Sequence, residues 1–175
     1  PAPTDTPVPT PTPVPAAYYL EQGDLQLLSN DFDAAEASYA QALEIDPDLV
    51  TAQAHQTFAL ALQPAAWEAS LTAAEALIGD YPDAAESWAV YELVQMHNGH
   101  YAEVPAAAEK AVELDETSAI AQVALAKALL AGADIEPAIA AAESALDLAT
   151  GSPLDTVLAE LVLAEGYAAD GRIDE

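Results

Sequence analysis

The sequence predicts an all-α protein, built as a stack of antiparallel helix pairs behind an extended N-terminal arm. Three observations lead to this prediction. Hydrophobic residues make up 53% of the chain, and the excess is largely alanine, which suits close packing of helices. From Ala16 onward the apolar residues follow helical spacing. Comparison of the chain with itself gives a repeat period of about 34 residues, which is typical of solenoids built from helix pairs.

The arm covers residues 1–15 and contains seven prolines. Proline fixes φ and removes an amide donor, so polyproline II is the regular conformation open to this segment. We expect a stiff, extended arm. We also expect its Pro-flanked threonines to be O-glycosylated, because the arm has no fold that could bury them; these are Thr4, Thr6, Thr10 and Thr12.

The helical region covers residues 16–175 and divides into repeating units. These lie near 16–49, 50–84, 85–118 and 119–152, with a partial unit at 157–175. Aspartates fall at several predicted helix starts, where a carboxylate can cap free backbone amides: Asp31, Asp83, Asp134 and Asp155. Small residues within each unit would let paired helices approach closely, and aromatic residues would fill the remaining space.

The pattern is clearest in the first unit, which carries Tyr19, Gly23, Phe32, Ala35, Tyr39, Ala42 and Pro47 at the characteristic spacing. In this respect the chain resembles the tetratricopeptide repeat (TPR) family. Later units depart from the family pattern, since the third has Val104 where a small residue is usual and Glu116 where proline is usual. The resemblance implies a right-handed superhelical solenoid of about four and a half helix pairs and a role in binding other proteins.

The charge of the chain excludes several classes of function. Thirty Asp and Glu against three Lys and Arg give a net charge of −27. Such a surface repels a phosphate backbone or an anionic lipid surface, so we expect neither nucleic-acid binding nor membrane insertion. Weak, diffuse binding of divalent cations to the acidic surface is compatible with this composition.

We expect no catalytic activity, no cofactor and no specific metal site. The chain has no Cys, no Ser-His-Asp pattern and no Gly-rich phosphate loop. His97 and His100 stand three residues apart, a spacing that occurs in metal sites, but a zinc site here would need carboxylates distant in sequence. A polar turn between helices is the simpler interpretation of these two histidines.

The resemblance also implies a concave groove lined by the first helix of each unit. The residues at the family's groove positions are mostly apolar: Leu20, Leu27, Leu28, Phe58, Leu62, Leu93, Met96, Ile120, Val123, Lys127, Leu130, Leu158 and Leu161. Lys127 is the one cation among them, which argues against the family's clamp for a peptide carboxylate. An apolar groove suits an extended peptide with periodic apolar residues.

Two hypotheses of function follow. In the first, the chain assembles head-to-tail into an extracellular filament, with Val8 and Val14 of the arm as anchors on a neighbouring copy. This hypothesis rests on the two ends of the stack, neither of which carries a polar capping helix. In the alternative, the groove is displayed to a heterologous proline-rich or apolar peptide or to a cell-surface partner, and the arm is only a spacer. The arm resembles the O-glycosylated spacers of bacterial secreted and surface proteins, so we expect an extracellular or cell-surface location.

Overall fold

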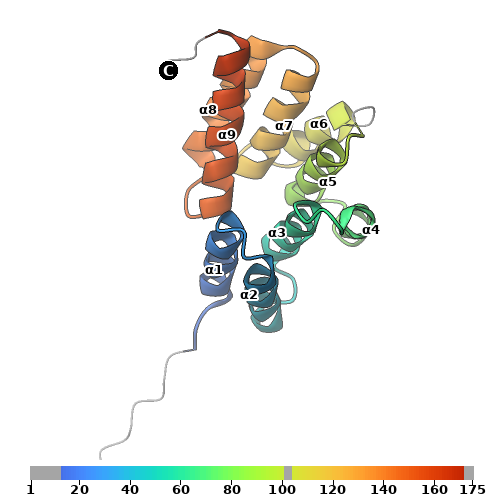
Figure 1. Cartoon of the computed structure of the whole chain (residues 1–175), viewed down its shortest axis with the longest axis vertical. Helices are drawn as coiled ribbons and strands as arrows, with labels where there is room; N and C mark the ends of the chain where they lie inside the picture. The colour runs from blue at the N-terminus through green and yellow to red at the C-terminus, as the bar shows by residue number, and fades with distance from the viewer. Residues whose placement is uncertain (1–12, 101–103, 172–175) are drawn as a thin grey trace, which may run out of the picture.

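The computed structural model describes residues 13–100 and 104–171 of the 175-residue chain. Within these ranges every regular element is an α-helix, which confirms the predicted all-α fold (Figure 1). The helices are α1 (Ala16–Leu28), α2 (Phe32–Ile45), α3 (Val50–Ala61), α4 (Trp67–Asp80), α5 (Ala85–His97), α6 (Val104–Leu114), α7 (Ala119–Ala131), α8 (Ile135–Leu148) and α9 (Pro153–Ala169). The four threonines predicted to carry glycans lie outside the described residues.

The helices form consecutive antiparallel pairs, α1 with α2, α3 with α4, α5 with α6 and α7 with α8. The odd-numbered helices also contact one another in order along the chain, from α1 to α9. Each even-numbered helix packs only on its chain neighbours among the described helices. The odd-numbered helices therefore make one continuous inner row, and this row positions the candidate site.

The row closes on itself. Helix α9 packs on α7 and α8, as in an open stack, but it also packs on α1 (Figure 1). At this seam the Ser152 hydroxyl donates to Asp24 Oδ2 at 3.4 Å, across 128 residues of sequence. The sequence led us to expect two separate, uncapped ends; instead the first and last helices cover part of each other.

Close packing of α1 on α2 explains the small residues of the first unit. Tyr39, Ala35 and Ala42 are fully buried between these helices. A Cβ added at Gly23 would lie 2.6 Å from Tyr39 Cδ1, well inside van der Waals contact. Glycine at position 23 thus makes room for the aromatic ring of the partner helix.

The predicted aspartate caps are only partly correct. Asp31 caps α2, because its Oδ1 accepts from the Ala34 amide at 3.3 Å. Asp134 precedes α8 but its side chain makes no capping bond, and Ala84 rather than Asp83 stands at the start of α5. Asp155 lies inside the first turn of α9, where Ser152 caps its amide at 3.1 Å. Its carboxylate is instead directed into the protein.

Candidate functional site

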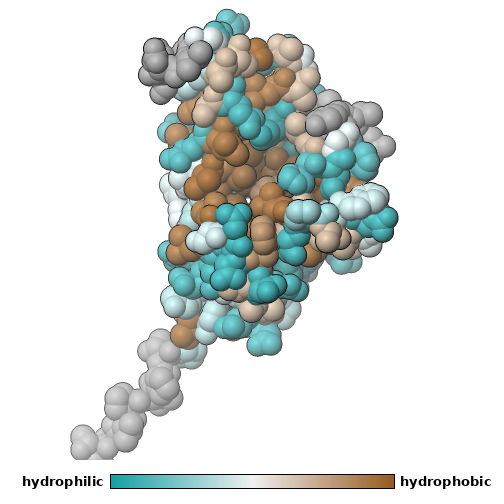
Figure 2. All heavy atoms as spheres, in the orientation of Figure 1, coloured by the Kyte–Doolittle hydropathy of each residue, from teal (hydrophilic) through white to brown (hydrophobic). Residues whose placement is uncertain are grey.

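An apolar pocket lies on the inner row of helices. It has a volume of about 550 Å³ and takes side chains from all five odd-numbered helices. Its lining consists of Leu27, Leu28, Asn30, Phe58, Leu62, Leu93, Met96, His97, Val123, Lys127, Leu154, Val157, Leu158 and Leu161. Figure 2 shows this region as a hollow of hydrophobic residues bordered by hydrophilic ones. Its volume falls within the range that holds a small ligand or several side chains of a bound segment.

Ten of the thirteen groove residues named from the sequence line this pocket. The other three do not: Ile120 is buried in the core, and Leu20 and Leu130 are partly buried beside it. The structure adds Asn30, His97, Leu154 and Val157 to the lining. Leu154 and Val157 contribute because α9 begins at Pro153, ahead of the partial unit expected from Val157, and because α9 reaches back to α1. Binding by these residues stays a prediction.

Apart from His97, Lys127 is the only described lining residue that can carry a formal charge, and it is already paired. Its Nζ donates to both carboxylate oxygens of Glu165, at 2.7 and 2.8 Å, and so links α7 to α9. No carboxylate of the described residues lines the pocket. Glu92 is fully buried in α5 next to the lining residue Leu93, and neither of its oxygens is hydrogen-bonded within the described part of the chain. Burial raises the pKa of Glu92 to about 9 against the opposing effect of Lys127, so this side chain is neutral at pH 7.

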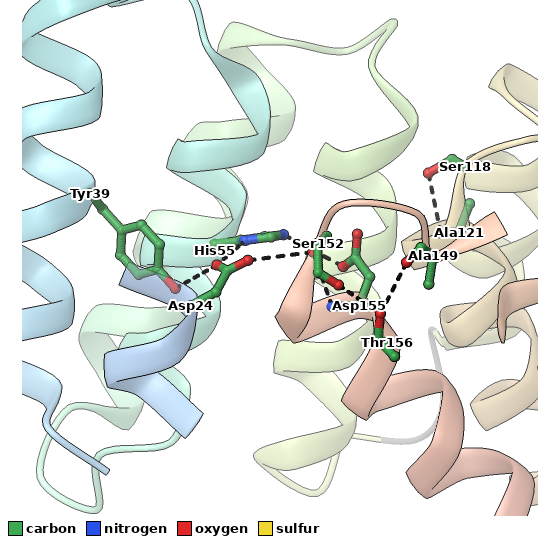
Figure 3. Close-up of polar contacts among 9 residues, drawn as sticks. All are labelled: Asp24, Tyr39, His55, Ser118, Ala121, Ala149, Ser152, Asp155 and Thr156. Carbon is green, nitrogen blue, oxygen red and sulfur yellow. Dashed lines mark hydrogen bonds and ion pairs between the residues drawn. The ribbon is translucent and has the colours of Figure 1, made fainter. Parts of the chain in front are cut away.

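A buried polar cluster holds the seam between the two ends of the row (Figure 3). His55 Nδ1 of α3 lies 2.7 Å from Asp24 Oδ1 of α1, and His55 Nε2 lies 3.5 Å from Asp155 Oδ1 of α9. The Tyr39 hydroxyl of α2 donates to Asp24 Oδ1 at 3.0 Å. With Ser152, these five residues are hereafter called the seam cluster. They join four helices: the bond between Tyr39 and Asp24 lies within the first repeat, and the contacts made by His55 and Ser152 cross between repeats.

Electrostatics within the seam cluster favour a charged histidine. Complete burial lowers the pKa of His55, but the nearby carboxylates of Asp155 and Asp24 outweigh burial and raise that pKa to about 9. Burial and the neighbouring Asp24 also raise the pKa of Tyr39 well above its usual range, so the phenol stays protonated. The cluster is therefore an imidazolium held between two carboxylates. Because Asp24 and His55 are at most 1% exposed, a substrate cannot reach them, and the arrangement is structural.

Sequence signals for the seam cluster are weak. Asp24 and His55 are ionisable residues in the middle of mainly apolar helices, which is uncommon unless they are paired. Asp24 stands 31 positions before His55 and Asp155 stands 100 positions after it, beyond the reach of a helical pattern. The sequence pattern predicts a helix cap at Asp155, whereas its carboxylate reaches His55.

The histidines His97 and His100 do not come together at a metal site. His97 lies at the pocket, whereas His100 Nδ1 lies 3.0 Å from Gln95 Oε1. Among residues 13–100 and 104–171, no three His, Asp or Glu side chains are grouped so as to hold a metal ion. Within the same ranges, no helix is both long and apolar enough to cross a bilayer.

Comparison with known proteins agrees with this architecture. The family model of the tetratricopeptide repeat matches residues 16–49, which contain α1 and α2. No curated protein sequence matches the chain.

Several solved structures share the fold. A thermophilic TPR protein of Thermus thermophilus, TTC0263, is 18% identical with a TM-score of 0.64, over 91% of this chain and 84% of that one. The MamA protein is 18% identical with a TM-score of 0.50 over the same shares. The APC/C hetero-tetramer Cut9-Hcn1 gives 15% identity and a TM-score of 0.61, over 88% of this chain and 30% of that one. At these identities the likeness establishes the fold alone: the chain is a TPR-type helical solenoid.

Proposed function

We propose that this chain is a protein-interaction scaffold whose pocket holds an extended, apolar segment of another polypeptide. The single observation that carries the proposal is the lining, in which side chains from five helices form one apolar hollow. Some of these side chains remain open to solvent, with Leu161 at 51% and Val157 at 39% exposed. An apolar hollow of this kind is a common mark of a binding site on a protein surface.

A TPR-type fold supports the coarser part of the proposal, a role in binding proteins. One of the structurally similar chains was solved in an assembly, the APC/C hetero-tetramer Cut9-Hcn1. The proposal assigns no catalytic role to the chain.

The test uses labelled peptides in which apolar residues alternate with proline, with binding followed by fluorescence anisotropy. Leu161→Gln removes an exposed apolar side chain from the pocket while keeping a good helix former. We expect affinity to fall about fivefold, the equivalent of about 1 kcal/mol of lost apolar contact.

The matched control is Ile45→Gln, which removes a side chain of similar size and 50% exposure at the end of α2, outside the pocket. This variant should bind like the parent. Equal binding by the parent and Leu161→Gln would show that the pocket is not where the peptide lies.

A second candidate is self-assembly into an extracellular filament, in which the bound segment is the arm of a neighbouring copy. It is favoured by exposed apolar side chains on the two end helices, Tyr18 and Leu25 on α1 and Val157 and Leu161 on α9. Fifteen residues in polyproline II span about 45 Å, long enough to pass several helices packed about 10 Å apart. The Pro-Thr composition of the arm supports a location outside the cytoplasm.

Two variants test this candidate by sedimentation velocity and electron microscopy: deletion of residues 1–15, and Leu161→Glu together with Leu163→Glu. If the arm and α9 make the contacts, both variants assemble less than the parent. If both assemble like the parent, or if the parent remains a monomer at all concentrations, self-assembly through these contacts is wrong.

A further inference from the structure

We propose that the segment held by the pocket belongs to a cationic partner: an apolar stretch of polypeptide flanked on both sides by Lys or Arg. This inference rests on the proposed function, because it names the chemistry of the occupant of the same pocket. It is carried by the distribution of charge around the pocket.

The contrast between the pocket and its surroundings is the first step. The chain has 30 carboxylate side chains, yet none of those in residues 13–100 and 104–171 lines the pocket. Exposed carboxylates stand directly beside the lining in sequence: Asp31 follows the lining residue Asn30, and Glu160 precedes Leu161 on α9. An occupant thus meets apolar walls inside the pocket, on a chain whose net charge is −27.

The lysines supply the second step, because neither is free to receive an anion. Lys127 is held by Glu165 at the pocket, and Lys110 is held by Glu113 on α6 at 3.0 Å. An acidic segment, or a peptide ending in a free carboxylate, would have to displace Glu165 to pair with the lysine of the pocket. A segment flanked by lysine or arginine requires no such displacement.

The net charge of the chain decides between a cationic partner and a second copy as the occupant. The net charge of −27 attracts cationic side chains that approach within the screening length of about 8 Å at physiological ionic strength. A second copy of the chain would instead bring another −27 towards the same surface. Its arm offers no cation to offset this repulsion, since residues 1–15 contain Asp5 and no Lys or Arg. The charge therefore favours a basic partner over a second copy.

The experiment compares four labelled peptides by fluorescence anisotropy at low and high salt. Three share one apolar core and carry two Lys, two Ser or two Glu on each side, and the fourth has the sequence of residues 1–15. Exposed ion pairs are worth about 0.2–1 kcal/mol each, or about 1.4- to 5-fold in affinity. Four such pairs predict at least about a fourfold preference for the Lys-flanked over the Ser-flanked peptide at low salt, with the Glu-flanked peptide weakest. The preference should shrink at high salt.

Two variants connect the preference to the pocket. Glu165→Gln frees Lys127, so it should weaken the Lys-flanked peptide and strengthen the Glu-flanked one. Its control, Glu113→Gln, removes the same charge from the pair with Lys110, away from the pocket. It should change the affinities of the two peptides only by the small effect of lowering the net negative charge by one. Leu161→Gln should weaken all core-containing peptides without changing their order.

The outcomes separate the two proposals. Equal binding of the Lys- and Ser-flanked peptides, both sensitive to Leu161→Gln, would overturn the cationic partner and leave the proposed function intact. Tighter binding of the residue 1–15 peptide would identify a second copy as the occupant and overturn the inference. If the Lys-flanked peptide binds most tightly but neither Leu161→Gln nor Glu165→Gln changes its affinity, the attraction is diffuse and directed to the acidic surface as a whole. This outcome also overturns the inference. If no peptide binds, the proposed function itself fails.

Discussion

At the scale of single residues, His55 is the charged group on which the others in the seam cluster depend. Among the described residues it is the one cation facing the two carboxylates of Asp24 and Asp155, and all three side chains are buried. Tyr39 and Ser152 add hydrogen bonds to Asp24 but no charge. Removing the imidazolium would leave two buried anions facing each other, so the cluster's stability depends on the charge of this histidine.

We therefore predict that His55→Ala lowers the free energy of unfolding by about 3–5 kcal/mol, the usual cost of breaking a buried ion pair from one side. Chemical denaturation followed by circular dichroism measures this change. His97→Ala, at an exposed histidine, is the control and should change stability by less than about 0.5 kcal/mol. Similar values for the two variants would contradict a charged role for His55.

The pH dependence of stability follows from the same group. Because folding raises the pKa of His55 from 6.5 to about 9, the stabilisation is fully present below pH 6.5 and is lost as pH rises through 9. This group alone should thus contribute a loss of up to about 3 kcal/mol between these values. Denaturation across this range should show the loss in the parent. Glu92 loses stability over the same range, so the contribution of His55 is the part of the loss that His55→Ala abolishes, and an equal loss in parent and variant would show that His55 does not contribute.

Glu92 is another buried ionisable residue, and its burial lowers stability at neutral pH. Its folded pKa of about 9 against an ordinary 4.5 means that the folded protein binds a proton that the unfolded chain releases. Stability from this group is complete below pH 4.5 and falls as pH rises towards 9. Glu92→Gln should therefore be more stable than the parent at pH 7, by up to about 3 kcal/mol.

Denaturation at pH 4.5 and pH 7 tests this prediction, because the advantage of Glu92→Gln should be small at the lower value. Glu75→Gln, on the exposed face of α4, removes the same formal charge and serves as control. If both variants gain equally, the gain comes from the lower net charge rather than from burial at position 92.

At the scale of elements, the contact between α1 and α2 depends on one missing side chain. Gly23→Ala would push a methyl group into the ring of Tyr39 and disturb the bond from Tyr39 to Asp24. We expect a loss of about 1–3 kcal/mol in the free energy of unfolding, typical of overpacking. Gly79→Ala is the matched change, since a Cβ there meets nothing within 4 Å, and it should stabilise α4 by up to about 1 kcal/mol. Thermal unfolding of both variants should show shifts of opposite sign.

The elements are largely predictable because their signals are local. The aromatic and small residues of the first unit recur at helical spacing, so Tyr39 can be placed opposite Gly23 without knowledge of the rest. The helix starts are less predictable: Asp31 caps α2, but at α9 the cap is Ser152. There the proline at position 153 begins the helix, although the pattern alone predicts the start of the last unit only from Val157.

At the scale of the whole molecule, closure of the inner row was not predictable. A helical period indicates which residues face a neighbouring repeat, but it does not give the angle accumulated along the row. Contact between α1 and α9 depends on that angle, and the pairing of Asp24 with Ser152 has no local signature. Ten groove residues could be named because each has a fixed place within its own repeat. Leu154 could not, because it precedes the partial unit expected from Val157 and lies on the helix that packs on α1.

Because α9 packs on α1, a destabilising substitution in α9 should also destabilise α1. Leu154→Ala removes a buried side chain at the start of α9, and we expect a loss of about 2–5 kcal/mol. Native-state hydrogen exchange should then accelerate in α1 as well as in α8 and α9. Leu77→Ala makes the same truncation in α4, and its local effect should centre on α3 to α5. If Leu154→Ala accelerates exchange only in α8 and α9, the two ends of the row are not coupled and the prediction is wrong.

The long sequence separation at the seam also bears on how the chain is made. Synthesis proceeds from the N-terminus, and local helix pairs can form as soon as they emerge. Asp24 and His55 are then already present and paired, but Asp155 and Ser152 come about 100 residues later than His55. Until α9 is complete, the pocket lacks the four lining residues of that helix, and His55 has one carboxylate instead of two. The nascent protein therefore passes through a stage in which the pocket is incomplete and the carboxylate of Asp155 is not yet paired with His55. At this stage its apolar lining is open to association with other chains.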